Sequence, residues 1–172
     1  MELPRSTLVG IETAAADRAG LWGRRALLIL LLVFVLCGAS GLLGVHSTTS
    51  SAQEDGWAVS MRYAATARAG LDVPWEVTVR HTGGFGKEIT LAVTASSFDI
   101  LESQGFEPEP SDETRDADTM YLTFASPPGD TLVVSFDAYI KPSAQEGRSG
   151  TVAVLTGGRR VAAVPVHTVL FP

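Results

Sequence analysis

The residues with the greatest potential for chemistry lie in one acidic stretch near the middle of the chain. Six carboxylates fall within the twelve residues from Glu107 to Asp118. Carboxylate oxygens are ligands that calcium prefers, and Asp112, Asp116 and Asp118 offer them at short spacing. The stretch lacks the glycine that a calcium loop of the EF-hand type needs, and Arg115 lies among the acids. The pattern therefore favours a solvated loop between strands, with a calcium-dependent ligand- or sugar-binding domain as the alternative.

Other residue patterns typical of catalysis are absent from the sequence. The three histidines, His46, His81 and His167, have no helical i, i+4 ligand spacing, and the single cysteine, Cys37, lies inside an apolar run. No G-x-S-x-G nucleophile motif, Walker-type phosphate loop or dinucleotide-binding glycine motif occurs. The sequence therefore predicts a protein that is not an enzyme and that needs no cofactor, calcium being the one alternative.

A continuous apolar run from Ala26 to Val45 decides where the rest of the chain is located. As a helix rising about 1.5 Å per residue, its 20 uncharged residues would span about 30 Å, the thickness of a bilayer's hydrocarbon core. Four arginines precede the run, and no Lys or Arg follows it until Arg62. Because basic residues stay on the cytoplasmic side, we expect a cytoplasmic tail at residues 1–25. Residues 26–45 would then be the only transmembrane helix, a signal anchor in the plasma membrane, with the C-terminal part extracellular.

The apolar run has an alternative interpretation as a cleaved signal peptide. Small residues from Cys37 to Gly41, and again from Ser50 to Ala52, are typical of cleavage sites. The apolar character resumes at Leu42, and the segment before the run is long, which favours an uncleaved anchor. Cleavage would instead release a secreted binding module.

Small residues in the outer half of the run predict close contact with a second helix. Cys37 and Gly41 are four residues apart, as are Ser40 and Gly44, so each pair would share one face of a continuous helix. Small residues at this spacing let two helices approach closely. We therefore expect a helix-packing surface toward an integral membrane or envelope protein. The alternative is a glycine-rich helix end without a packing role.

The composition of the C-terminal part excludes some classes of partner. Residues 46–172 carry 9 Lys and Arg against 16 Asp and Glu, a net charge of −7. Nucleic-acid binding needs grouped basic residues to neutralise phosphates, so we expect no such partner. No cysteine falls in this part, and a packed core has to stabilise it without disulfides. The excess of Arg over Lys and the abundance of Ala, Gly and Val are typical of a GC-rich bacterial genome.

The apolar pattern changes its period to two from about residue 58. Before that point, residues 46–57 have the composition of a flexible juxtamembrane linker. Beyond it, seven runs of alternating apolar residues are separated by turn signals, which predicts an all-β fold, an antiparallel β-sandwich of immunoglobulin-like type over residues 58–172. Trp75 is the expected central core aromatic. The runs begin near Val59, Val73, Ile89, Met120, Leu132, Val152 and Val161.

Four large apolar residues lie in a stretch that otherwise has the composition of a loop. They are Phe98, Ile100, Leu101 and Phe106. Such side chains can cover the open end of a sandwich, which we favour, because large apolar residues are mostly buried. The alternative is an exposed contact surface for a partner.

The order of strands and turns resembles that of a known family. The segments WEVTVRHTGG, EITLAVTASSFDIL, YLTFASPPGDTLVVSFDAYI and GTVAVLTGG follow one another between about Val73 and Gly157. This order is similar to that of the conserved immunoglobulin-like repeat domains of bacterial and archaeal surface proteins. The resemblance implies a stalk or binding module outside the membrane, without catalytic residues. His81 replaces the Asn usual in the first turn, and the chain has one copy rather than an array.

Overall fold

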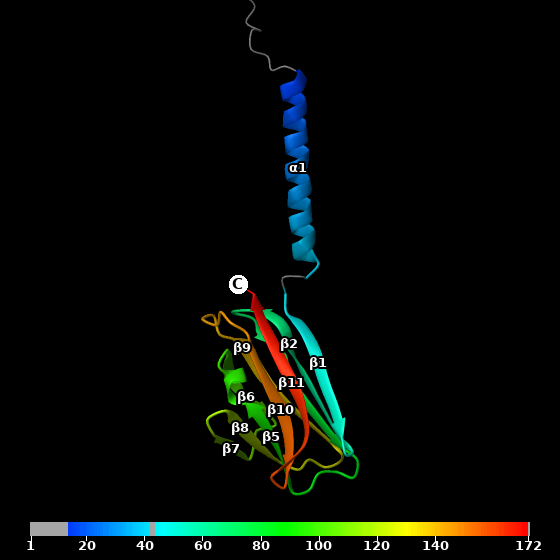
Figure 1. The fold of residues 1–172 in the computed structure, drawn as a ribbon, viewed down its shortest axis with the longest axis vertical. Helices are drawn as coiled ribbons and strands as arrows, with labels where there is room; N and C mark the ends of the chain where they lie inside the picture. The colour runs from blue at the N-terminus through cyan, green and yellow to red at the C-terminus, as the bar shows by residue number, and fades with distance from the viewer. Residues whose placement is uncertain (1–13, 42–43, 172) are drawn as a thin grey trace, which may run out of the picture. The chain divides into compact units, whose positions relative to one another are not determined.

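A computed structural model describes residues 14–41 and 44–171 of the chain (Figure 1). The chain divides into two compact units, residues 1–43 and 44–172. The described part of the first is one helix, α1 (Ala14–Ala39), and the second is built of strands. The first part of the predicted cytoplasmic tail, residues 1–13, lies outside the described residues.

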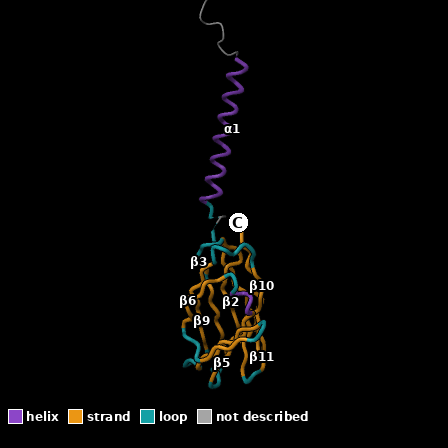
Figure 2. The backbone as a smooth tube through the Cα atoms, turned by 90° about the vertical axis from the view of Figure 1, so that its left-hand side faces the viewer, coloured by secondary structure: helices purple, strands orange, loops and turns teal. Residues whose placement is uncertain are grey.

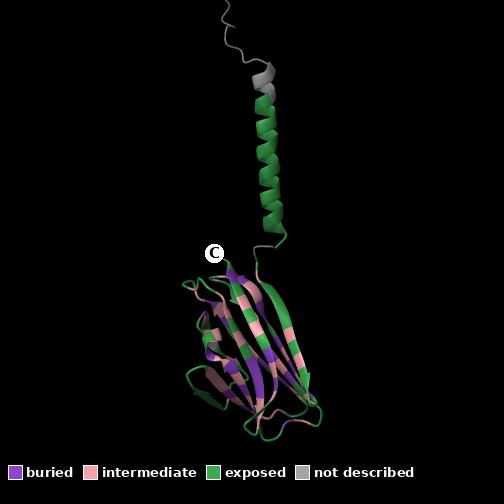
Figure 3. Cartoon of the chain, viewed as in Figure 1, coloured by how far each residue is buried: buried purple, intermediate pink, exposed green. Residues whose placement is uncertain are grey.

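Helix α1 exposes apolar side chains around its whole circumference. The stretch from Ala19 to Ala39 is 21 residues long, and none of it is buried inside the protein. Figure 3 shows the exposure along this stretch, where Leu30 and Phe34 are 66% and 72% exposed. Such a helix is long and apolar enough to cross a membrane, and a signal sequence has the same features. The expected N-terminal apolar helix is therefore confirmed.

The helix begins and ends earlier than the sequence predicts. The prediction for the apolar helix was residues 26–45, whereas α1 takes in residues 14–25 and stops at Ala39. At that end the Ser40 N–H donates to the Leu36 carbonyl oxygen at 2.9 Å. Gly41 has a φ of 73°, a left-handed conformation that terminates helices and favours glycine. The small residues after Ala39 therefore end the helix instead of extending it.

The second unit contains eleven strands between residues 44 and 171. Figure 2 shows that loops and one short 3₁₀ turn, η1 (Ala95–Phe98), complete this part of the chain. The strands in chain order are β1 (His46–Glu54), β2 (Trp57–Arg68), β3 (Asp72–Val73), β4 (Trp75–His81), β5 (Glu88–Thr94), β6 (Leu101–Glu107), β7 (Asp112–Arg115), β8 (Thr119–Ala125), β9 (Thr131–Ile140), β10 (Arg148–Thr156) and β11 (Arg159–Phe171).

The strands form one curled sheet whose two halves face each other. In one half, β1 pairs with β2, β2 with β4, and β4 with β9, while β3 and β6 both pair with β9. In the other half the order is β11, β10, β5, β8 and β7. The end of β11, residues 169–171, pairs in parallel with residues 66–68 of β2 and joins the two halves. The remaining ladders are antiparallel.

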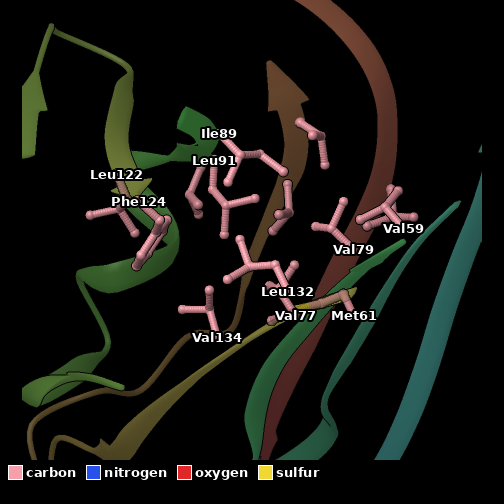
Figure 4. Packing of buried hydrophobic residues seen from close by; sticks show 14 of the residues in the cluster. Val59, Met61, Val77, Val79, Ile89, Leu91, Leu122, Phe124, Leu132 and Val134 are labelled. Carbon is pink, nitrogen blue, oxygen red and sulfur yellow. The ribbon is translucent and has the colours of Figure 1, made fainter. Parts of the chain in front are cut away.

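The core lies between the two halves and is made of the alternating apolar residues. Val77 and Val134 come from one half and Leu91 and Leu122 from the other, and all four are 0% exposed (Figure 4). Outward-facing neighbours such as Val133 remain exposed, as a period of two requires. The predicted all-β, sandwich-like fold with an N-terminal helix is therefore confirmed.

The strand count is higher than the seven predicted. The seven expected strands are β2, β4, β5, β8, β9, β10 and β11, and the structure adds β1, β3, β6 and β7. Residues 46–57 differ most from the prediction. They were expected to form a flexible linker, but His46–Glu54 forms β1 and pairs with β2 along its length. β1 is mostly exposed and lacks apolar alternation, so its backbone pairing with β2, not its side-chain pattern, makes it a strand.

The packing of the core predicts that truncating an inward-facing side chain lowers the free energy of unfolding much more than truncating an outward-facing one. We expect Leu91→Ala to lower the free energy of unfolding by about 2–5 kcal/mol, because it leaves a cavity between the two halves. Val133→Ala, on the outer face of β9, should cost less than about 1 kcal/mol. Urea denaturation of the full chain in detergent measures both. Equal losses would contradict the two-layer core.

Candidate functional site

Four aromatic rings gather where β6 approaches the core. The ring centroids of Phe106 and Phe136 are 4.7 Å apart, and Trp75 lies 5.7 Å and 5.8 Å from them. Phe98, at the end of η1, is 5.5 Å from Phe136 and completes the cluster. Trp75 is 7% exposed, which confirms it as a core aromatic. Tilted and edge-to-face pairs of this kind add stability beyond the area they bury.

The aromatic cluster forms part of the floor of an open groove between β6 and β7. The groove has a volume of about 490 Å³. One wall comes from β6, a strand of the first half of the sheet, and the other from β7, a strand of the second half. We call this feature the edge groove. Its lining residues are Phe98, Leu101, Gly105, Phe106, Glu109, Pro110, Ser111, Asp112, Glu113, Met120 and Phe136.

The four apolar residues predicted as core cover or contact surface are all at least partly buried. Ile100 is 5% exposed and packs in a second apolar cluster with Ala64 and Ile140. Phe98, Leu101 and Phe106 pack against the main core but stay half-buried. Their remaining exposed parts line the edge groove.

The acidic stretch is only partly the loop that the sequence predicts. Its residues Asp112–Arg115 form β7, an exposed edge strand paired with β8. Asp112 lies in the edge groove together with Phe98 and Phe106, so residues from two separate predictions meet there. Met120 and Phe136 also line the groove, and the sequence did not predict them there because they carry no signal beyond their places in strand patterns.

Asp116 caps the turn between β7 and β8. Its carboxylate accepts hydrogen bonds from the backbone N–H groups of Asp118 and Thr119, at 3.0 Å and 2.8 Å, and from the Tyr121 hydroxyl at 3.0 Å. These bonds stabilise the anion and hold the pKa of Asp116 below its ordinary value. The same contact raises the pKa of the Tyr121 hydroxyl.

The part of the chain that the structure describes contains no assembled set of ligands for the calcium ion of the alternative prediction. There, no group of three His, Cys, Asp or Glu side chains lies close enough to hold a metal ion. Asp112 is paired opposite Thr123, whereas the Asp116 carboxylate is directed to the turn that it caps. The structure therefore does not bring the three predicted ligands together.

Each histidine makes a local contact. The His81 Nδ1 donates to the Gly84 carbonyl oxygen at 2.7 Å, and its ring stacks on Trp57 with centroids 4.1 Å apart. The His46 Nδ1 lies 3.1 Å from the Gly44 oxygen, and the His167 Nδ1 lies 2.6 Å from the Ser149 hydroxyl. His81 therefore fixes a turn. The three rings belong to different local arrangements.

The predicted helix-packing surface does not have the expected geometry. Of its four residues, only Cys37 lies within α1, which ends at Ala39. The Ser40 hydroxyl donates to the Cys37 carbonyl oxygen at 2.8 Å, and Gly41 turns the chain out of the helix. Gly44 belongs to the second unit. Cys37 and Gly41 therefore do not both lie in α1, and Ser40 and Gly44 lie outside it.

A scan against protein-family models found no match, and a search of curated proteins found none. A fold by itself does not define a function. The edge groove combines charged side chains with an apolar, aromatic floor.

The lowered pKa of Asp116 predicts how the stability of the folded chain depends on pH. Because its pKa is lower in the folded state, its contribution is present above the ordinary aspartate range and is lost as the pH falls through the lowered pKa. We expect Asp116→Asn to melt at a lower temperature at neutral pH and to lose less stability on acidification. Melting curves between neutral pH and about pH 2 measure this. Asp118→Asn is the matched control, and an identical pH profile for the two variants would contradict the capping role.

Calcium is expected to leave the melting temperature of the full chain unchanged at millimolar concentration. The Asp116 oxygens already accept hydrogen bonds within the turn, and the site lacks a converging third ligand among the described residues. A bound ion would stabilise by about 2.7 kcal/mol at a hundred times its dissociation constant, which is readily measured. A rise that disappears in Asp112→Asn would instead support the calcium-binding alternative.

Proposed function

We propose that the chain is a single-pass plasma-membrane protein whose β-domain, residues 44–172, is a non-catalytic module for protein interaction or scaffolding outside a bacterial cell. The observation that carries this proposal is an exposed apolar helix followed by a separately folded β-domain. An apolar surface of that size is unfavourable in water and is covered by a membrane or a partner.

The residues at the start of the apolar stretch support a cytoplasmic N-terminus. Arg24 and Arg25 directly precede the uncharged run that begins at Ala26, and the guanidinium carbon of Arg25 lies 6.0 Å from the centroid of the Trp22 ring. Arginine and tryptophan are enriched at membrane interfaces, and basic residues favour the cytoplasmic side. The sequence after the helix carries no Lys or Arg before Arg62.

The arrangement of the β-domain supports an immunoglobulin-like module. All seven strands predicted from the pattern occur in their expected order, and Trp75 lies in the core. These features agree with the resemblance to the immunoglobulin-like repeat domains of bacterial and archaeal surface proteins. Sandwich domains cluster their loops at the two ends, and in antibody variable domains the loops of one end bind the partner.

The end of α1 favours a second candidate, a secreted binding module. The helix stops at Ala39, and the turn that follows consists of the small residues Ser40 and Gly41. Small residues after an apolar helix are the features of a signal-peptide cleavage site. Cleavage there would release the β-domain from the cell.

Topology is tested by labelling single cysteines in intact cells. In a Cys37→Ser background, Glu54→Cys places a thiol on the exposed β1, and Arg5→Cys places one in the predicted tail. We expect a membrane-impermeant maleimide to label the first in intact cells and the second only after permeabilisation. Labelling in the reverse pattern would contradict the proposed orientation. Protein recovered from the medium with an N-terminus near Ala39 would establish the secreted module.

The interaction role is tested by copurification from the native host. The full chain, tagged at its C-terminus and extracted in mild detergent, is expected to bring a stoichiometric envelope protein with it. A matched chain with the apolar stretch of α1 replaced by a leucine helix locates the contact. A partner retained by that chain binds the β-domain, and a partner lost from it binds the helix. Recovery of the protein without any stoichiometric partner would contradict the interaction role.

A further inference from the structure

We propose that the edge groove binds an extended segment of a partner protein that carries a basic and an apolar side chain two residues apart, and therefore on the same face, added as a strand to the free edge of β7. This inference names the partner chemistry for the proposed interaction role. It rests on that role only in requiring the partner to lie on the same side of the membrane as the β-domain.

The floor of the groove offers apolar surface to such a segment. Phe98, Leu101, Phe106 and Met120 are half-buried, so each keeps part of its side chain accessible from the groove. Phe136 lies beneath them and is 4% exposed. An apolar side chain of an added strand would contact this floor and remove its accessible surface from water.

The backbone of β7 has an edge available for pairing. The Asp116 N–H donates to the Thr119 carbonyl oxygen at 3.0 Å, which defines Asp116 and Thr119 as a hydrogen-bonded pair. Such pairs alternate along antiparallel strands, so Thr114 also directs its backbone toward β8. Glu113 and Arg115 then direct their backbone N–H and C=O groups away from β8. No strand among residues 44–171 pairs with that outer edge, and an extended chain can add there.

The charge of the groove selects a basic segment. Glu109, Asp112 and Glu113 line it, and Arg115 is the one cation of β7. Glu113 pairs opposite Leu122, which is 0% exposed, so its side chain lies on the face of the sheet that is directed to the core. A Lys or Arg of the incoming strand, placed opposite Glu113, would pair with this carboxylate.

The same carboxylate disfavours other occupants. An apolar strand would cover Glu113 without a partner for its charge, and inward-pointing charges protect sheet edges in this way. A second copy of β7, added antiparallel with Glu113 opposite Arg115, would also set Asp112 opposite Asp116 twice. Like charges directly opposite each other are destabilising. A basic segment of another protein therefore fits the edge better than a second copy of this chain.

The test uses the full chain in lipid nanodiscs and a short fluorescent lysine–valine peptide of Lys-Ser-Val-Ser repeats, in which lysine and valine share one face of the strand. Fluorescence anisotropy is expected to show binding at least about tenfold tighter than that of a glutamate–valine peptide of the same length. Glu113→Lys should weaken lysine–valine binding by about tenfold or more. Glu54→Lys makes the same charge change on exposed β1, away from the groove, and should leave binding unchanged. Both substituted residues are exposed, and melting curves check that the variants fold.

A lysine–valine peptide methylated on every backbone nitrogen separates strand addition from simple charge attraction. It keeps the side chains but cannot donate backbone hydrogen bonds, so we expect its binding to be lost. Equal binding of the methylated peptide, equal binding of the acidic peptide, or no binding of the basic peptide would each overturn the proposal. Association between protein-loaded nanodiscs that Glu113→Lys abolishes, without peptide binding, would assign the edge to a second copy. If Glu54→Cys is still labelled from outside in intact cells, any of these results would contradict the assignment of the groove. It would not contradict the proposed membrane topology.

Discussion

The β-domain depends on one constraint, the burial of two alternating apolar faces against each other. The halves of the curled sheet supply these faces, and residues such as Val77 and Leu91 are fully buried between them. The only cysteine of the chain, Cys37, lies in α1, so no disulfide supports the β-domain. Core packing therefore provides what disulfides provide in many small secreted domains.

Closure of the sheet explains why one side of the sandwich is sealed and the other is open. Along the sealed side, β11 begins beside β10 and ends beside β2, so one continuous strand belongs to both halves. On the other side, β6 and β7 belong to different halves and do not pair with each other. The aromatic cluster covers the core there but leaves the edge groove between the two strands. The groove is thus a consequence of how the sheet closes.

Charge placement at this open side limits what can bind. An exposed edge strand is a template for pairing with any extended chain. β7 is short, and all four of its residues are charged or polar and exposed, which suppresses indiscriminate pairing. Asp116 then fixes the turn into β8 through its hydrogen bonds, so the acidic stretch is ordered by its own backbone contacts.

The sequence by itself determined the features that depend on periodicity and composition. The apolar run predicted an N-terminal helix, and the period-2 runs predicted seven strands and the burial of Trp75, because burial on one face imposes that spacing on a strand. Tertiary structure alone decided the rest. β1 and β7 became strands through pairing with β2 and β8 without an apolar pattern, which no local signal encodes. Likewise, Phe106, Met120 and Glu113 meet in one groove only because the two halves of the sheet close on each other, bringing together residues from separate strands.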